Sequence, residues 1–201
     1  MPTPLLRAQG LHRLQVGPID LELDAGACLA VTGPSGAGKS VLLRMLADLD
    51  PHRGEAWLDG RACSAMTAPA WRRQVGYVAA DSGWWQPLVG AHFPAGTDFA
   101  RLLPSAGIAA EAAGWPVARL STGERQRLAL LRALRPGLRV LLLDEPTSGL
   151  DADNVARVEA LLGQQRAQGL GLLIVTHDAA QAARLATHRL SLQGGRPGAP
   201  S

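Results

Sequence analysis

The sequence predicts an α/β fold with a mainly parallel central sheet. Two uninterrupted apolar runs, at residues 140–143 and 172–175, are typical of strands that are covered on both faces. A third apolar run, at residues 28–31, precedes a glycine-rich loop and a stretch with helical character. Strands that alternate with helices around buried runs indicate this fold class.

Length and composition restrict the class of protein. The chain has 201 residues, of which 47% are hydrophobic, and this is enough for one domain with a sizeable core. The formal net charge is +3 and the arginines are spread along the chain, so no basic patch predicts nucleic-acid binding. No apolar stretch approaches the ~20 residues that span a bilayer, and the N-terminus lacks a signal-peptide core. Cys28 and Cys63 have neither metal nor redox spacing. We therefore expect a cytoplasmic protein without a nucleic-acid partner.

The first part of the chain is expected to consist mainly of short strands. Leu5 is followed by apolar residues at alternate positions in 19–23, a pattern that is typical of half-buried strands. Residues 24–27 are interpreted as a hairpin-like turn before the strand at 28–31. The further elements expected here are a helix at 41–47, a strand at 55–58, a short helix at 70–74 and a strand at 75–78.

Residues 79–118 differ in character, with four prolines and a concentration of aromatic side chains. We predict a short helical subdomain of loops and helices in this segment, with helices around 98–103 and 109–113. Further helices are expected at 124–134, 153–168 and 179–185, beside the apolar strands. The Gly/Pro-rich residues 194–201 are expected to be disordered. The prediction is therefore a single domain over 1–201, with its core in 1–78 and 119–193.

The glycine-rich loop matches the phosphate-binding pattern G-x-x-x-x-G-K-[ST], here GPSGAGKS. Its glycines let the backbone curl so that N–H groups point at phosphate oxygens, and the helix that follows adds its positive end. Lys39, the only lysine in the chain, would reach the terminal phosphates, and Ser40 would ligate Mg²⁺. The loop therefore predicts a nucleoside-triphosphate site. Its expected contacts are Gly33, Pro34, Ser35, Gly36, Ala37, Gly38, Lys39, Ser40 and Val41.

Two adjacent carboxylates, Asp144 and Glu145, follow the apolar run at 140–143. Ligands of open α/β sheets bind beyond the carboxyl ends of the strands. An aspartate there can hold Mg²⁺, and the following glutamate can take a proton from an attacking water. Two acids after a strand would also suit an ordinary turn, but the phosphate loop favours the catalytic interpretation. We therefore expect Asp144 to share the metal with Ser40 and Glu145 to be the base.

With its segments in this order, the sequence resembles the ATP-binding cassette (ABC) ATPases over nearly its whole length. Residues 120–127 (LSTGERQR) resemble the family signature, which other phosphate-loop NTPases lack. Residues 148–151 (SGLD) resemble the D-loop, and 176–178 (THD) resemble the segment with the switch histidine. The resemblance implies a phosphate-loop NTPase of ABC type, with an N-terminal antiparallel β subdomain and a short helical subdomain.

The resemblance also implies roles for individual residues. ATP and Mg²⁺ would lie in the interface of a head-to-tail dimer. Ser121, Gly123 and Glu124 of one copy would face the phosphate loop of the other. His177 would position the γ-phosphate and the water, and would be catalytic together with Glu145 and Lys39.

The sequence departs from the family pattern at several positions. Ala80 stands where a glutamine that contacts Mg²⁺ and water is usual, with Asp81 and Gln86 as candidate replacements. Thr122 stands where glycine is usual in the signature. No aromatic residue is evident for stacking on adenine, and His12 is a weak candidate. The rate of hydrolysis and its coupling to a partner are therefore open.

The resemblance implies the ATP-hydrolysing subunit of an ABC transporter on the cytoplasmic face of the inner membrane. Its partners would be separate transmembrane subunits and a second ABC subunit, expected to be a copy of the same chain. Trp84, Trp85 and Phe93 would suit an apolar partner surface, or would equally fill the core of the small subdomain. Two alternatives stay open: a soluble ABC ATPase of iron–sulfur assembly, repair or translation, and a regulatory module that hydrolyses ATP weakly. The transported substrate and the direction of transport stay open as well.

Overall fold

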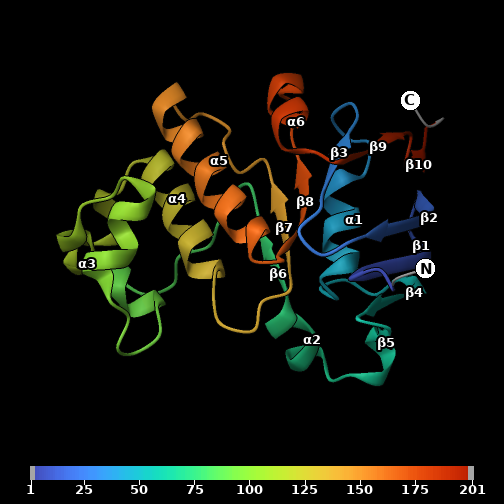
Figure 1. The fold of residues 1–201 in the computed structure, drawn as a ribbon, viewed down its shortest axis with the longest axis horizontal. Helices are drawn as coiled ribbons and strands as arrows, with labels where there is room; N and C mark the ends of the chain where they lie inside the picture. Colours follow the sequence, from blue (N-terminus) through green and yellow to red (C-terminus); the bar gives the residue numbers. More distant parts are fainter. Residues whose placement is uncertain (1–2, 199–201) are drawn as a thin grey trace.

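The computed structural model describes residues 3–198, in which two β-sheets and a group of helices lie side by side (Figure 1). The smaller sheet is antiparallel, with the strand order β2-β1-β4-β5. Its strands are β1 (Leu6–Arg13), β2 (Val16–Leu23), β4 (Arg53–Leu58) and β5 (Arg61–Ala62). Inward-facing apolar residues alternate with exposed ones along β2, as in a strand with one buried face.

The larger sheet has six strands in the order β10-β9-β3-β8-β7-β6. Every neighbouring pair from β9 to β6 is parallel, and only β10 runs antiparallel to its neighbour. The strands are β3 (Cys28–Thr32), β6 (Val75–Val78), β7 (Val140–Asp144), β8 (Gly171–Val175), β9 (His188–Gln193) and β10 (Arg196–Pro197). All residues of β7 and β8 are buried. The predicted α/β fold with a mainly parallel sheet is therefore confirmed.

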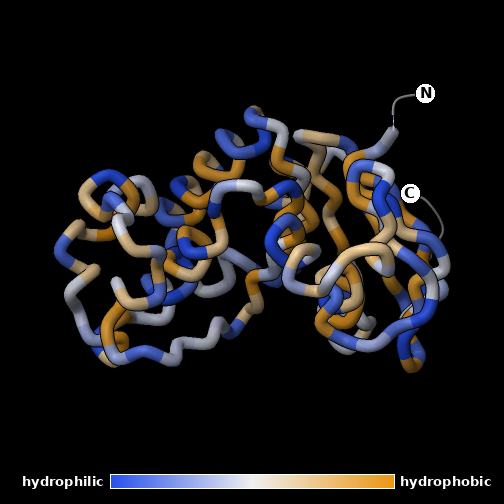
Figure 2. The backbone as a smooth tube through the Cα atoms, turned by 90° about the horizontal axis from the view of Figure 1, so that it is seen from below, coloured by the Kyte–Doolittle hydropathy of each residue, from blue (hydrophilic) through white to orange (hydrophobic). Residues whose placement is uncertain are grey.

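Helices cover both faces of the central sheet, so its strands separate two cores. The helices are α1 (Lys39–Leu46), α2 (Ala68–Gln74), α3 (Phe99–Leu102), α4 (Thr122–Ala133), α5 (Ala152–Ala167) and α6 (Ala179–Leu185). Leu142 and Leu173 point to the core shared with α1 and the smaller sheet, whereas Leu141 and Leu143 point to the core shared with α4 and α5. Figure 2 shows hydrophobic stretches of the backbone, in orange, in the middle of the molecule.

The segment 79–118 is built from single turns rather than regular helices. The predicted helix near 98–103 is one turn, α3, continued by a 3₁₀ turn at Leu103–Ala106, and the predicted helix near 109–113 is a 3₁₀ turn at Ala110–Gly114. Two further 3₁₀ turns are Val89–His92 and Val117–Arg119. Prolines remove backbone donors and interrupt longer helices, which accounts for the short elements.

Two local predictions are wrong. Residues 24–27 do not form a hairpin, because β2 and β3, which they join, belong to different sheets. Residues 194–198 are not disordered: Gly194 and Gly195, with φ of 53° and 82°, turn the chain so that β10 pairs with β9. Residues 199–201 of the predicted tail lie outside the described residues. Within residues 3–198, no helix combines the length and apolar character needed to cross a membrane.

Candidate nucleotide site

The glycine-rich loop joins the end of β3 to the start of α1. Gly33, Gly36 and Gly38 have φ values of 142°, 77° and 93°, which L side chains rarely adopt. A Cβ on Gly38 would lie 2.3 Å from Val16 Cγ2, and a Cβ on Gly33 would lie 2.2 Å from Leu192 O. Gly36 has no atom within 4 Å of such a position. Two of the three glycines are therefore required by packing as well as by conformation.

Lys39 is the first residue of α1, and its side chain lies within the curl of the loop. It is buried, and its Nζ donates to Gly33 O at 2.8 Å and to Pro34 O at 3.0 Å. The carbonyl groups hold the ammonium group at the centre of the loop, next to the positive end of the helix dipole. Ser40 is exposed beside it. This arrangement favours a phosphate group, because the Lys39 ammonium group and the N-terminus of α1 both place positive charge there.

Glu145 and His177 meet beside this loop, at the carboxyl ends of neighbouring strands. Glu145 follows β7 and His177 follows β8, and His177 Nε2 lies 3.0 Å from Glu145 Oε1. The Glu145 N–H donates to Val175 O at 3.0 Å, so the end of β8 holds the start of the loop that carries Glu145. Both side chains are partly open to solvent. The structure thus brings a carboxylate and an imidazole together where a water molecule could reach both.

The backbone of Glu145 is held in an unfavourable conformation. Its φ is +50°, in the left-handed region that non-glycine residues rarely occupy. Its carbonyl oxygen accepts from Gln126 Nε2 at 2.6 Å and from Ser148 N at 3.2 Å. Strain of this kind persists only where neighbours fix the residue, and it is common at functional sites.

Asp144, the last residue of β7, is buried with its carboxylate close to Tyr77 of β6. The Tyr77 hydroxyl donates to Asp144 Oδ2 at 3.3 Å. Burial raises the pKa of Tyr77 to about 12, and the charge of Asp144 contributes to the rise. Tyr77 therefore stays protonated at neutral pH and keeps donating to the carboxylate.

Ser40 and Asp144 offer hydroxyl and carboxylate oxygens, the donors that Mg²⁺ prefers, so the residues present fit this ion. Within residues 3–198, no group of three or more His, Cys, Asp or Glu side chains is arranged to hold a metal. A magnesium site with few protein ligands is typical of sites that are completed by substrate phosphates and water.

A hollow of about 420 Å³ lies beside His177, between the ends of the central strands and α6. Its lining residues are Thr32, Gly33, Thr176, His177, Ala179, Ala182, Arg189 and Ser191. A larger cavity of about 730 Å³ lies between α3, α4 and α5, and none of the predicted site residues lines it. Of the predicted site residues, Gly33 and His177 line the smaller hollow.

Ser121, Gly123 and Glu124 lie at the start of α4, which begins two residues before its predicted start. Ser121 caps the helix: its Oγ accepts from Glu124 N at 3.2 Å, and Glu124 Oε2 accepts from Ser121 N at 2.8 Å. A Cβ on Gly123 would lie 2.9 Å from Leu150 Cδ2. In the part of the chain that the structure describes, no hydrogen bond or ion pair joins these three residues to the glycine-rich loop.

The loop after β6 carries the position where the family pattern has glutamine. Ala80, Asp81 and Gln86 are all exposed. Buried His92 orders the loop, because its Nε2 accepts from Trp85 N and from Gln86 N, both at 3.0 Å.

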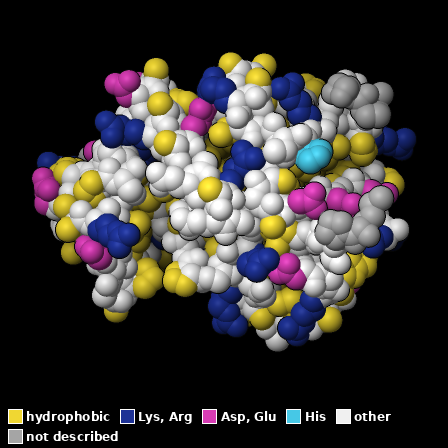
Figure 3. Space-filling model, in the orientation of Figure 1, with side chains coloured by type: hydrophobic (Ala, Val, Ile, Leu, Met, Phe, Trp, Pro, Cys, Tyr) yellow, Lys and Arg dark blue, Asp and Glu magenta, His cyan; other side chains and the backbone are white. Residues whose placement is uncertain are grey.

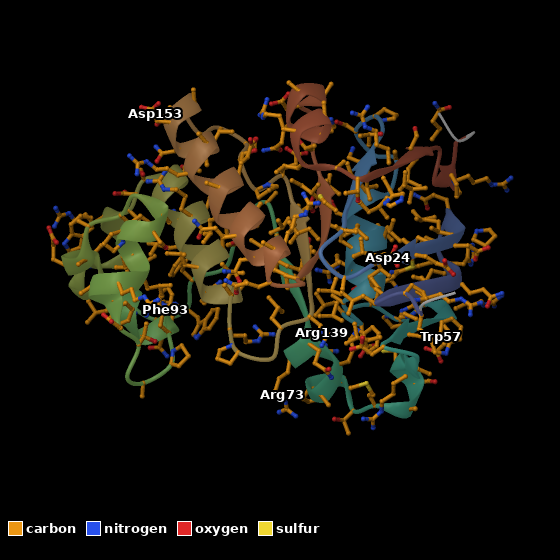
Figure 4. The ribbon with its side chains drawn as sticks, viewed as in Figure 1. Asp24, Trp57, Arg73, Phe93, Arg139 and Asp153 are labelled. Atoms are coloured by element: carbon orange, nitrogen blue, oxygen red, sulfur yellow. The ribbon has the colours of Figure 1, made fainter. Side chains whose placement is uncertain are left out.

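The three aromatic residues of this region differ in exposure. Phe93 is buried and packs edge-on against Phe99, with ring centroids 5.4 Å apart, and Figure 4 shows it within the helical subdomain. Trp84 and Trp85 lie 4.7 Å and 4.8 Å from the guanidinium of Arg132, and Trp85 is 69% exposed. Phe93 thus belongs to the subdomain core, whereas Trp85 is free to contact a partner.

Sequence reasoning missed four residues that support the site. Tyr77 and Gln126 contact Asp144 and Glu145, while Val16 and Leu192 pack against the glycine-rich loop. No local pattern marks these residues, because each is brought to the site by the sheet or by helix packing. By contrast, the capping box of α4 follows the S-x-x-E signal at 121–124 and could have been predicted.

The glycine-rich loop at the end of one parallel strand, with acids after another parallel strand of the same sheet, defines a phosphate-loop nucleotide-binding protein. The family profile described as "ABC transporter" matches residues 16–148, more than half of the chain. The chain therefore belongs to the ABC transporter family.

Two curated relatives and one solved structure illustrate the similarity. The methionine import ATP-binding protein MetN of Thermobifida fusca is 39% identical, over 80% of this chain and 55% of its own length. The macrolide export ATP-binding/permease protein MacB of Agrobacterium fabrum is 33% identical, over 89% of this chain and 32% of its own. A dimeric ATP-binding cassette bound to ADP and Pi superposes with a TM-score of 0.82 at 21% identity, over 98% of this chain and 97% of its own. This chain thus spans only part of the length of the two relatives, and the solved structure shows a shared fold.

Proposed function

We propose that this chain binds ATP at the glycine-rich loop and hydrolyses it as the energy-supplying subunit of an ABC transporter. The observation that carries the proposal is the contact between Glu145 and His177, 3.0 Å apart, beside that loop. A nucleotide-binding loop alone would account for binding of ATP but not for its hydrolysis. A carboxylate and an imidazole at the same sheet edge add the groups that hydrolysis needs.

The proposed mechanism assigns one task to each group. Lys39 neutralises the charge of the terminal phosphates. Glu145 accepts the proton of the attacking water, and the fixed backbone of this residue aims its carboxylate. His177 lies within hydrogen-bonding distance of Glu145 and orients the water and the γ-phosphate. Positioning and charge stabilisation supply most of the rate in phosphoryl transfer, so rigid placement of these groups matters more than any single pKa.

Ser40 and Asp144 are proposed to hold Mg²⁺. Bound there, the ion would neutralise the charge that develops on the phosphate oxygens. Tyr77 keeps the Asp144 carboxylate in place through its hydroxyl group. This hydrogen bond leaves the other carboxylate oxygen available.

We further propose that two copies bind ATP between them. Within residues 3–198, no hydrogen bond or ion pair joins Ser121, Gly123 or Glu124 to the loop of their own chain. A neighbouring copy could bring them to that loop instead. The solved cassette bound to ADP and Pi is dimeric, which agrees with this arrangement for a protein of the same fold.

The proposed partners are separate transmembrane subunits, with the chain at the cytoplasmic face of the inner membrane. The relatives are named for import and for export, which supports a transport role and leaves the direction open. Trp85 offers an exposed aromatic surface on the loop after β6. In Figure 3, Lys and Arg side chains are dispersed over the visible face among apolar and acidic ones.

We also propose that the chain forms a single domain, with its core in residues 1–78 and 119–193.

One observation favours a second candidate, a nucleotide-binding module with weak hydrolysis. Ala80 stands exposed where the family pattern has a glutamine, and a methyl group can neither bind Mg²⁺ nor orient water. Asp81 and Gln86 are exposed on the same loop and remain candidates to supply a polar group.

Co-purification tests the transporter role. Tagged Glu145→Gln would be recovered from native membranes with MgATP, and its partners would be identified by mass spectrometry. We expect a protein with several membrane-spanning segments. Recovery of soluble partners only, with the chain absent from washed membranes, would contradict the proposal and favour a soluble ABC ATPase.

A further inference from the structure

The C-terminal hairpin formed by β9 and β10 is attached to the tip of the hairpin formed by β1 and β2. The N–H of Gly17 donates to Gly195 O at 2.7 Å. Gly195 is buried, and a Cβ on it would lie 2.1 Å from Gln15 O and 3.1 Å from Val16 Cα. The obstructing atoms are backbone, so no side-chain rotation could relieve the overlap. Figure 1 shows β10 close to β2, although the two strands are more than 170 residues apart in the sequence.

The same two hairpins contact the glycine-rich loop. Val16, next to the attached residues of the first hairpin, occupies the space beside Gly38, where a Cβ would lie 2.3 Å from its Cγ2. Leu192 of β9 places its carbonyl oxygen beside Gly33, where a Cβ would lie 2.2 Å from it. The loop is therefore supported at its first and last glycines by segments that Gly195 joins together.

We propose that Gly195 is a positioning residue for nucleotide binding. It holds the β1–β2 hairpin in the place where Val16 supports the phosphate loop. This inference rests on the proposed function, since it concerns the same nucleotide site. It adds a requirement for the C-terminal hairpin, whose residues carry none of the predicted binding roles.

The geometry separates this role from catalysis. Glu145 and His177 follow β7 and β8, and within residues 3–198 no hydrogen bond or ion pair joins either of them to Gly195 or to the first hairpin. A change at Gly195 is therefore expected to alter the affinity for nucleotide and to leave the chemical step intact.

Gly194 provides a matched control for the experiment. It lies in the same turn with φ of +53°, but no atom lies within 4 Å of its added Cβ. Both Gly195→Ala and Gly194→Ala place an alanine at positive φ, and only the first collides with the other hairpin. Binding of a fluorescent ATP analogue, ATP hydrolysis and thermal unfolding would be measured for the full chain with each change.

We expect Gly195→Ala to raise the Kd for nucleotide and the KM for ATP by about tenfold, within the usual range of coupling between sites. The kcat should stay within about twofold, and Gly194→Ala should bind as the wild type does. Equal nucleotide affinity in the two variants would overturn the inference. Failure of the wild-type chain to bind ATP would instead overturn the proposed function.

A second measurement on the wild-type chain covers the case in which Gly195→Ala does not fold. By reciprocity, nucleotide that binds a loop supported by the hairpin must also stabilise the hairpin. Hydrogen exchange of the peptide that covers residues 194–198 should therefore slow at least threefold when MgATP saturates the site. Unchanged exchange at saturation would overturn the inference.

Discussion

His177 Nε2 lies 3.0 Å from Glu145 Oε1, and this contact joins the ends of two neighbouring parallel strands. The backbone of Glu145 is fixed by a neighbour, since Gln126 Nε2 donates to its main-chain carbonyl oxygen at 2.6 Å. The histidine follows β8, which Glu145 also contacts through its own N–H group. A change in either residue should therefore impair hydrolysis without unfolding the sheet.

His177→Ala should reduce the rate of phosphate release from MgATP by about 10²-fold. This lies within the range typical for loss of a group that takes part in general acid–base catalysis. Affinity for ATP should change little, because the glycine-rich loop is untouched. His188→Ala, an exposed change on β9, is the control and should hydrolyse at the wild-type rate. Equal rates for the two variants would remove His177 from the mechanism.

Gly123→Ala should block ATP-dependent dimerisation while the chain still folds. Its Cβ would lie 2.9 Å from Leu150 Cδ2, the end of a flexible side chain that can move aside. In a Glu145→Gln background with MgATP, light scattering after size exclusion should show monomers.

Gly163→Ala in the same background should dimerise, because nothing lies within 4 Å of the added methyl group. It should also gain about 0.5–1 kcal/mol in free energy of unfolding from its helical position. Dimers of both variants would argue against the proposed role of Gly123.

Trp85→Ala should lower recovery of the membrane partner severalfold and leave ATP hydrolysis by the isolated chain unchanged. The side chain is 69% exposed, so its removal leaves the subdomain core intact. Trp57→Ala is the matched control, since this tryptophan lies on β4, well separated from Phe93 of the helical subdomain in the view of Figure 4. Unchanged membrane recovery with Trp85→Ala would exclude Trp85 from the partner surface.

The stability of α1 should depend on pH through Asp50. Arg44 of α1 donates to Asp50 through Nε and Nη2, both at 2.8 Å, and these hydrogen bonds lower the pKa of Asp50 below 3.8. A lowered folded-state pKa means that the stabilisation is full above about 3.8 and is lost as the pH falls through the folded value. Asp50→Asn should therefore lower the free energy of unfolding by up to about 1 kcal/mol at pH 7. The difference between the variant and the wild type should shrink below pH 3.8. Urea unfolding of both proteins between pH 2.5 and 7 measures this. A difference that does not depend on pH would show that the charge of Asp50 plays no part.

The sequence predicted the parallel sheet because its central strands are buried on both faces. The apolar runs that became β3, β7 and β8 are unbroken, and apolar spacing located α5 within one residue at each end. Strand β9 was missed because four of its six residues are polar and only Leu192 is fully buried. Its place in the sheet is fixed by pairing with β3, which no local pattern encodes.

The predicted site residues lie at the ends of β3, β7 and β8 and at the start of α4. Their supports could not be predicted. Tyr77 reaches Asp144 only because β6 pairs with β7, and Gln126 reaches Glu145 only because α4 packs against that end of the sheet. Such contacts depend on which strands and helices become neighbours. Motifs therefore predict which residues carry the proposed roles, and the fold determines which residues hold them in place.

Release of phosphate from MgATP by the wild type and by Glu145→Gln tests the central claim most directly. The amide of glutamine is nearly isosteric with the carboxylate but cannot accept the proton from water at neutral pH. The wild type should turn over, and Glu145→Gln should bind ATP and form dimers with turnover reduced by about 10³-fold. Equal rates of phosphate release from the two proteins would contradict the assignment of Glu145 as the base and the mechanism built on it.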